Sequence, residues 1–219
     1  MYTITDGNTK VMLEAGISMK EIKKALNFKV SDLACVLLSH SHLDHSKSIK
    51  DVAKLGVNCY MSQGTADELN IEHHRIKPVN ARETFRVGTL RIMPFEVEHD
   101  TDNPYGYLVV SDNGSKLLFA TDTYYIRYRF SGLNYLMVEC NYSQKILDEN
   151  ILSGRTPKVL RKRLMRSHFS LENMKEFLKA NDLSELQEIW LLHLSDSNSN
   201  EEQFRQEVAE LTGKMIYIP

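Results

Sequence analysis

Four potential metal ligands follow a single apolar run within a few residues. The run ends at Leu38, and the next residues along the chain supply His40, His42, Asp44 and His45. Neutral imidazoles and carboxylates are ligands that zinc, manganese and iron all accept. Burying such a group of side chains at the end of a strand is costly unless a cation pairs with it. This segment therefore predicts a metal centre, with His40 and His42 facing one ion and Asp44 and His45 facing a second.

Three further candidate ligands each follow an apolar, strand-like run: His99, Asp122 and His193. Strand ends are places where a rigid scaffold can present side chains to a shared site. A lone histidine or aspartate at a strand end is more often an ordinary structural residue. Taken together with the histidine-rich segment, the three residues complete the coordination of two ions.

The composition bounds the remaining possibilities. The chain has 219 residues and a formal net charge of −2, so no overall field attracts it to nucleic acid or to a membrane surface. We expect a single domain over residues 1–219. The beginning of the chain lacks a basic region followed by an apolar core, and no apolar run approaches the ~20 residues of a membrane span. We therefore expect a soluble, cytoplasmic protein whose three widely spaced cysteines are buried reduced thiols: Cys35, Cys59 and Cys140.

Strand and helix patterns alternate along the chain, which favours an α+β fold of two mixed sheets covered by helices. Possible capping boxes at Ser18/Glu21 and Thr65/Glu68 predict the starts of two helices, and Ser170 is the expected cap of a helix over 171–180. Gly213 is expected to end a helix over 201–211. We also expect the first and last strands to share a sheet edge region. Strands are predicted at 8–14, 34–38, 57–61, within 84–98, and at 107–110, 116–120, 136–138, 188–192 and 215–218.

The order of these ligands resembles that of the metallo-β-lactamase fold superfamily. The resemblance rests on the segment from His40 to His45, followed by His99, Asp122 and His193, and it covers nearly the whole chain. It implies an αββα sandwich with the site at one edge. It also implies two divalent ions, zinc or manganese. The first would be held by His40, His42 and His99, the second by Asp44, His45 and His193, and Asp122 would bridge them.

Further segments resemble the phosphodiesterase and nuclease branch of that superfamily, in particular its small YycJ/WalJ-like proteins. These are the bridging Asp122 and the segments 137–142, 167–170 and 193–198. In related nucleases, the histidine at the position of His168 protonates the leaving group with a glutamate partner, which here implies Glu139. Asp44 would both bind metal and orient the nucleophile. The alternatives are that His168 is a surface residue beside a helix and that Glu139 is a simple strand-end charge.

Three other features have two interpretations each. Glu14 either supports the site from behind the ligands or is a surface charge. Several aromatic and basic residues after Asp122 either line the cleft or have no role there: Tyr124, Tyr125, Arg127, Tyr128 and Arg129. A run of cations just before His168 either contacts phosphates or is the solvated face of a helix with Leu160 and Leu164 on its apolar side: Arg155, Lys158, Arg161, Lys162, Arg163 and Arg166.

These observations together lead to the hypothesis of metal-dependent phosphodiester hydrolysis. The substrate would be DNA, RNA or a cyclic nucleotide, and the resemblance makes a homodimer an open option. One alternative is a thioester or lactone hydrolase, because the same pair of ions supports that chemistry. Another is a metal-binding protein without catalytic activity.

Overall fold

The computed structural model describes residues 1–219. The strands form a five-stranded sheet of order β1-β2-β3-β4-β5 and a seven-stranded sheet of order β12-β11-β10-β9-β8-β7-β6. Each sheet contains both parallel and antiparallel pairs, so the expectation of two mixed sheets with flanking helices is confirmed. By its contacts the chain divides into two compact units. The first unit comprises Met1–Glu96 and Thr101–Gly114, and the second comprises Val97–Asp100 and Ser115–Pro219. The expectation of a single domain stays a prediction.

The first unit contains the whole five-stranded sheet. Its first two strands are antiparallel and the other pairs are parallel. Three antiparallel strands, β6 to β8, also belong to this unit. The strands are β1 (Tyr2–Thr5), β2 (Lys10–Leu13), β3 (Cys35–Leu37), β4 (Asn58–Met61), β5 (Ile76–Pro78), β6 (Phe85–Val87), β7 (Leu90–Glu96) and β8 (Tyr105–Ser111).

Alternate residues of the five-stranded sheet face a helical layer. Met12, Val36 and Cys59 share one apolar cluster with Ile22 and Val52 from the helices, and all five are fully buried. Burial on this scale stabilises a unit because each such side chain contributes about 1.5–3 kcal/mol when removed from water. The helices of the first unit are α1 (Met19–Ala25), α2 (Leu43–Ser46), α3 (Ile49–Lys54) and α4 (Gln63–Leu69), with a short 3-10 turn, η1, at Val30–Asp32.

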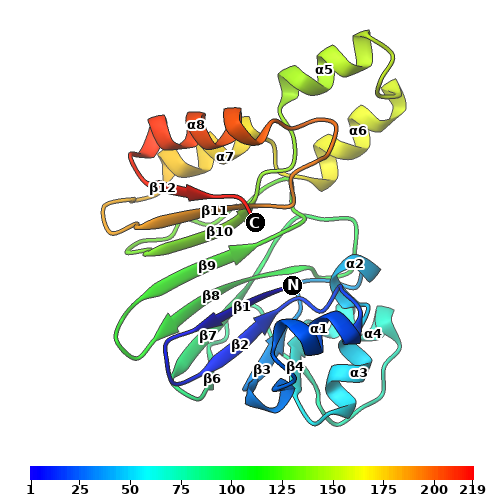
Figure 1. Cartoon of the computed structure of the whole chain (residues 1–219), viewed down its shortest axis with the longest axis vertical. Coiled ribbons are helices and arrows are strands. Elements are labelled where there is room, and N and C mark those ends of the chain that lie inside the picture. Colours follow the sequence, from blue (N-terminus) through cyan, green and yellow to red (C-terminus); the bar gives the residue numbers. More distant parts are fainter. The chain divides into compact units, whose positions relative to one another are not determined.

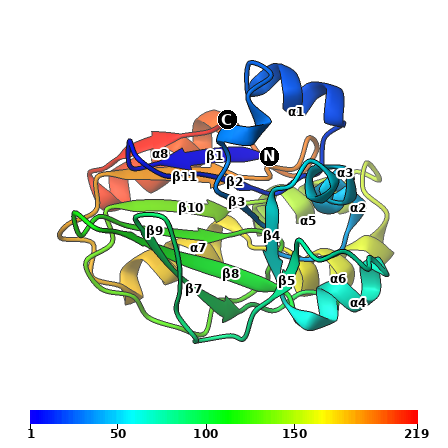
Figure 2. The ribbon, with the colours of Figure 1, turned by 90° about the horizontal axis from the view of Figure 1, so that it is seen from below.

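The second unit is built on four parallel strands. Because they are parallel, their carboxyl ends lie along one edge of the sheet. Helices α7 and α8 lie side by side over this sheet, whereas α5 and α6 extend beyond the end of its strands (Figures 1 and 2). The elements are β9 (Lys116–Ala120), β10 (Tyr135–Glu139), β11 (Glu188–Leu192), β12 (Met215–Tyr217), α5 (Gln144–Leu152), α6 (Lys158–Ser167), α7 (Leu171–Ala180) and α8 (Glu201–Thr212).

Several local predictions are confirmed. Ser18 and Glu21 form a complete capping box at the start of α1. The Ser170 side chain accepts a hydrogen bond from the backbone of Asn173 and caps α7 at the predicted residue. Gly213 ends α8 in the left-handed conformation that glycine adopts at low cost.

Two predictions are wrong. Thr65 does not cap α4, because Ser62 lies three residues earlier and its side chain accepts the Thr65 N–H at 3.0 Å. The first and last predicted strands do not share a sheet edge, because the strand predicted at 8–14 is β2 of the five-stranded sheet and β12 belongs to the seven-stranded sheet. Strands β1 and β5 and helix α5 were not predicted. Helix α5 buries only Leu147 and Asn150, so its sequence carries a weak apolar pattern.

The three cysteines are free and buried, as expected. Burial raises the pKa of the Cys59 thiol to about 12 and raises that of Cys140 well above its usual range. None of the helices is long and apolar enough to span a membrane.

Candidate metal centre

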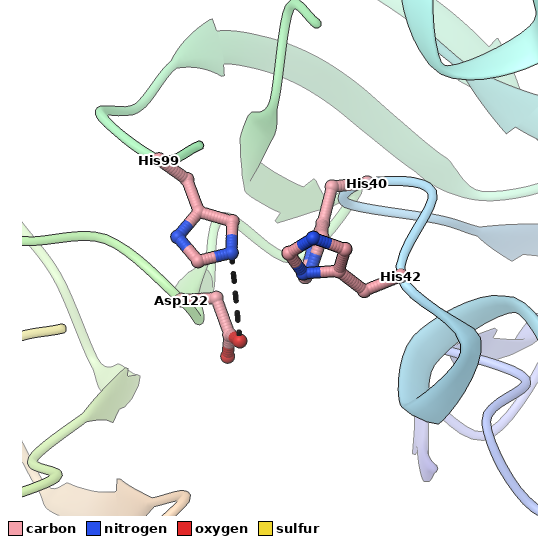
Figure 3. Close-up of side chains that lie close together, drawn as sticks. All are labelled: His40, His42, His99 and Asp122. Carbon is pink, nitrogen blue, oxygen red and sulfur yellow. Dashed lines mark hydrogen bonds and ion pairs between the residues drawn. The ribbon is translucent and has the colours of Figure 1, made fainter. Parts of the chain in front are cut away.

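The predicted histidine-rich segment forms a compact cluster at the carboxyl end of β3. His40 is completely buried, and its Nε2 lies 3.1 Å from Nδ1 of His42. The Ser39 hydroxyl lies 2.8 Å from Nδ1 of His40, which holds the ring so that Nε2 faces the cluster. The ring of His45 lies 4.2 Å from that of His40, measured between centroids. Figure 3 shows His40 and His42 with their ring nitrogens close together.

Glu14 stands behind this cluster as a buried carboxylate. One of its oxygens accepts the backbone N–H of Ser39 at 3.1 Å, and the other lies 3.3 Å from Nδ1 of His45. The other ring nitrogen of His45, Nε2, lies 3.5 Å from the carboxylate of Asp44, whose side chain is two-thirds exposed. A carboxylate behind an imidazole fixes the orientation of the ring and raises its basicity. Glu14 is only 2% exposed, so it is not a surface charge. The structure favours the other interpretation, in which Glu14 stands behind the candidate ligands.

Gly16 explains how the chain brings Glu14 and the histidine-rich segment together. A Cβ atom at Gly16 would lie 1.4 Å from the carbonyl oxygen of Asp44, closer than any two non-bonded atoms can lie. The neighbouring backbone is hydrogen-bonded, since Ala15 N–H donates to the carbonyl of His45 at 2.7 Å. Only glycine permits this approach of the two backbones.

A second cluster lies in the second unit, at the carboxyl ends of its parallel strands. Asp122 follows β9, Glu139 ends β10 and His193 follows β11, so the topology gathers three residues that are far apart in sequence. His168 joins them from the end of α6. One ligand atom from each of these four residues lies within 4.8 Å of the others.

Glu139 is the centre of the hydrogen bonds in this second cluster. It is fully buried, and one oxygen accepts the backbone N–H groups of Thr123 and Phe169 at 3.1 and 3.0 Å. The other oxygen lies 2.7 Å from Nδ1 of His168 and 3.1 Å from Nδ1 of His193. The expected contact of His168 with Glu139 is therefore present in the structure, and neither residue is a simple surface group.

His99 extends the second cluster through its contact with Asp122. His99 Nε2 lies 3.8 Å from the Asp122 carboxylate, which is the contact drawn in Figure 3. Its Nδ1 lies 3.0 Å from the carbonyl oxygen of Ser167. Because a carbonyl only accepts, Nδ1 donates in this contact, and Nε2 is the ring nitrogen that faces Asp122. Asp122 also lies 2.7 Å from Nδ1 of His193 and accepts the hydroxyl of Thr121.

Three residues of the two clusters have left-handed backbones. The φ angles of Glu14, Asp122 and His193 are 64°, 45° and 56°. This conformation costs on the order of 1–3 kcal/mol for a residue other than glycine and concentrates at functional sites. At His193 the strained peptide is held by the Asn141 side chain, which donates to the His193 carbonyl at 2.7 Å. These backbone conformations set the directions in which the three side chains leave the main chain.

The charges of the second cluster shift the pKa of its imidazoles. Burial lowers the pKa of His168, but the hydrogen bond and the negative charge of Glu139 outweigh burial and raise it overall. Burial likewise opposes the protonated form of His193, yet Asp122 and Glu139 raise its pKa to about 10. The second cluster is therefore strongly attractive to positive charge.

Most of the aromatic and basic residues after Asp122 line a cavity of about 260 Å³ in the second unit. Phe169 and Phe177 contribute to its apolar wall, and Asn173 ties the loop to α7 by donating to the Tyr124 carbonyl at 3.1 Å. Tyr124 itself is not among the lining residues. The residues of the loop that line the cavity are Tyr125, Ile126, Arg127, Tyr128 and Arg129.

The donors present in the two clusters fit divalent metal ions. Imidazole nitrogens and carboxylate oxygens lie close to one another, and several are ordered by a hydroxyl, carboxylate or carbonyl behind them. Nitrogen and oxygen ligands of this kind suit zinc and manganese. Which residues bind metal stays a prediction.

Comparison with known families decides the class of the protein. A family model described as the beta-lactamase superfamily domain matches residues 9–193, which include residues of both clusters. The chain belongs to this superfamily. The recognition of the fold and of a hydrolase of this superfamily is confirmed.

Two curated relatives carry nuclease names. The exodeoxyribonuclease YycJ of Bacillus anthracis is 28% identical over 96% of this chain and 83% of its own length. The exodeoxyribonuclease WalJ of Streptococcus pneumoniae is 28% identical over 92% of this chain and 79% of its own length.

Two solved structures share the fold. The metallo-β-lactamase fold protein YhfI of Bacillus subtilis has a TM-score of 0.74 at 16% identity, covering 99% of this chain and 86% of its own. Igni18, a metallo hydrolase from Ignicoccus hospitalis, has a TM-score of 0.67 at 13% identity, covering 99% of this chain and 89% of its own. At these identities the likeness establishes the metallo-β-lactamase fold alone.

The supporting residues were the part of the site that the sequence did not reveal. Ser39, Thr121, Thr123 and Asn141 all hold a candidate ligand or Glu139 in place. The first three also lie next to a candidate ligand in the sequence, beside His40 or Asp122. Small polar residues beside candidate ligands are a signal that was available for three of them. Asn141 supports His193 across 52 positions, which no local pattern indicates.

Proposed function

We propose that this chain is a dinuclear metal-dependent phosphodiesterase that acts on nucleic acid, with DNA as its substrate. The observation that carries the proposal is the Glu139–His168 pair beside Asp122 and His193 in the second unit. It provides a proton donor next to candidate metal ligands, which phosphodiester cleavage needs at the leaving oxygen.

The proposed ligands are those of the sequence prediction. His40, His42 and His99 would hold the first ion, Asp44, His45 and His193 would hold the second, and Asp122 would contribute to both. The order of these residues along the chain, and the membership of the superfamily, support this assignment. When bound, two divalent ions lower the pKa of a water molecule and offset the charge on phosphoryl oxygens.

Glu139, His168 and Asp44 have the other roles in the proposed reaction. Glu139 is fixed by two backbone N–H groups and holds His168 by its Nδ1, so the opposite nitrogen, Nε2, is presented in one direction. In that position His168 donates a proton to the oxygen of the leaving group. Glu139 stabilises the protonated imidazole before the transfer, and Asp44 orients the attacking oxygen. The buried hydrogen bonds behind these groups reduce the reorganisation that the reaction requires.

DNA is the favoured substrate because both curated relatives are named exodeoxyribonucleases. Each of them is similar to this chain over more than nine-tenths of its length. At 28% identity the names of the relatives support nucleic acid as the class of substrate. RNA and cyclic nucleotides contain the same phosphodiester bond and are therefore included in the test. Tyrosines and arginines around the cavity in the second unit are suited to contact bases and phosphates.

The first experiment measures hydrolysis of bis(p-nitrophenyl) phosphate after chelation and restoration of Mn²⁺ or Zn²⁺. We expect activity only with restored metal. End-labelled linear DNA, closed circular DNA, RNA and cyclic nucleotides are then compared, and an exonuclease degrades only the DNA with free ends.

The results distinguish the proposal from its alternatives. Hydrolysis of thioesters or lactones without any diester activity contradicts the proposal and favours the second class of hydrolase. Metal binding without hydrolysis of any of these substrates favours a metal-binding protein that is not catalytic.

A further inference from the structure

The strongest concentration of positive charge on this protein lies outside the two ligand clusters, on residues 144–167. We call this segment the basic arm; it consists of α5, α6 and their connection. It carries seven cationic and two anionic side chains, a net charge of +5, whereas the whole chain carries −2. Figure 1 shows α5 and α6 extending away from the sheet of the second unit.

The cations of α6 are exposed and aligned. Lys158, Lys162 and Arg166 follow one another at intervals of four residues, so they lie along one face of the helix for about 12 Å. All three are exposed, as is the adjacent Arg163. Arg161 is the exception, because it is paired with Asp148 of α5 at 2.8 Å.

This arrangement is unfavourable for the helix by itself. Like charges four residues apart on a helix repel one another. The first turn of α6 contains no acidic residue and includes Lys158, which the partial positive charge of a helix N-terminus disfavours. No side chain caps this end of the helix. A polyanion lying along α6 would remove these repulsions.

The arm is held near its middle and at its C-terminal end, so it has a defined direction relative to the second cluster. Near its middle, the Asn150 side chain donates to the carbonyl of Ser197 at 2.7 Å, and Thr156 N–H donates to the carbonyl of Asn150 at 3.0 Å. At its end, the Ser167 carbonyl contacts His99, and the next residue is His168. Arg166 thus lies two residues from the proposed proton donor.

We propose that the basic arm binds the phosphate backbone of the nucleic-acid strand that enters the site. This inference rests on the proposed function and narrows it from phosphodiesters in general to polymers. The face of Lys158, Lys162 and Arg166 contacts consecutive phosphates, and the end of α6 delivers the strand to His168. Such contacts are independent of base sequence and weaken as salt is added.

The test measures binding in EDTA, where hydrolysis does not contribute. A fluorescent single-stranded DNA of about 20 nucleotides exceeds the length that one strand-binding groove covers. Its affinity for the wild type is compared, over a series of salt concentrations, with that for Lys158→Ala/Lys162→Ala/Arg166→Ala. The matched control is Lys20→Ala/Lys24→Ala/Lys29→Ala, which makes the same change of charge on exposed positions of the first unit.

We expect the arm variant to lose at least about tenfold in affinity at low salt. Its plot of log affinity against log salt should be shallower by about 2, since each phosphate contact with a single strand contributes about 0.7 to the slope. The control and the charge-conserving variant Lys158→Arg/Lys162→Arg/Arg166→Lys should resemble the wild type. Hydrolysis of bis(p-nitrophenyl) phosphate should be unchanged in the arm variant, while the KM for DNA rises.

Three results would overturn the inference. One is equal weakening by the arm variant and the control, and another is an unchanged salt slope. The third is binding of the arm to vesicles of anionic lipid or to acidic protein with no binding of DNA. Failure of the proposed function gives a different pattern, in which the arm binds DNA but no diester is cleaved. Circular dichroism of each variant checks that α6 is folded.

Discussion

The two candidate ligand clusters are assembled in different ways. The cluster of the first unit comes from one short segment after β3, with Glu14 behind it. The cluster of the second unit takes its residues from separate segments, because the parallel strands β9, β10 and β11 end at one edge. The first is therefore a local feature of the sequence, and the second is a product of topology.

The difference also extends to how the ligands are oriented. In the first cluster a hydroxyl and a single buried carboxylate stand behind the imidazoles, at Ser39 and Glu14. In the second cluster Asp122 and Glu139 contact the imidazoles directly, and Glu139 is held by backbone N–H groups. The first arrangement is suited to hold metal, whereas the second combines candidate ligands with His168, the proposed proton donor.

The largest effect is expected from Asp122→Asn. The substitution retains the size of the side chain but removes the charge that faces His99 and His193. We expect metal-dependent diester hydrolysis to fall below detection, because the proposed ligand shared by both ions is lost. The assay is bis(p-nitrophenyl) phosphate hydrolysis with restored metal. Asp112→Asn, at a surface ion pair with Arg86, is the control that should retain full activity, and substantial activity of Asp122→Asn contradicts the assignment.

A smaller effect is expected from His168→Gln. Loss of a general acid slows turnover by about 10²–10⁴-fold. Metal content should be unchanged, because in the proposal His168 is bound by Glu139 and is not a ligand. Measuring kcat and the metal content of the same sample separates the two roles. His74→Gln, at an exposed position, provides the control; loss of metal from His168→Gln would show that this residue belongs with the ligands.

Glu14→Gln should weaken metal binding without abolishing it. The amide can still accept the N–H of Ser39, but it no longer presents a negative charge to His45. Loss of such a supporting group costs about 10–100-fold in metal affinity. Competition with a chelator measures this change. Glu21→Gln in the capping box of α1 is the matched control, and equal affinity for all three proteins would mean that Glu14 has a structural role only.

The smallest effect is expected from an ion pair outside both clusters. Lys175 of α7 and Glu207 of α8 lie 2.7 Å apart, and this contact raises the pKa of the lysine and lowers that of the glutamate. Glu207→Gln should cost less than about 1 kcal/mol at neutral pH. Because the pKa of Glu207 is lowered by folding, the contribution is present above its ordinary range and disappears as the pH falls through the lowered value.

Thermal unfolding at neutral and acidic pH measures the Glu207→Gln effect. The difference from the wild type should vanish in acid, and diester hydrolysis should be unchanged at neutral pH. A loss of diester hydrolysis at neutral pH, in a variant that remains folded, would show that the packing of α7 and α8 affects the second cluster.

The sequence allowed the prediction of the first cluster because its ligands are neighbours along the chain. The fold class and the strand-end positions of Asp122 and His193 could also be predicted, since apolar runs identify the strands. Other features depend on contacts that no local pattern encodes. Examples are the support of His193 by Asn141 and the choice of Ser62, in place of Thr65, as the cap of α4. Both Ser62 and Thr65 can cap a helix, and the tertiary context selects between them.

The most direct test of the central claim is the metal content of His42→Ala, His99→Ala and the double variant. The claim is that each ion takes ligands from both clusters, so His42 and His99 serve the same ion. It predicts two ions per wild-type chain and the loss of the same single ion from all three variants, with no further loss in the double variant. If the losses add, so that the double variant loses one ion for each substitution, the clusters are separate metal sites and the account of a shared centre is contradicted.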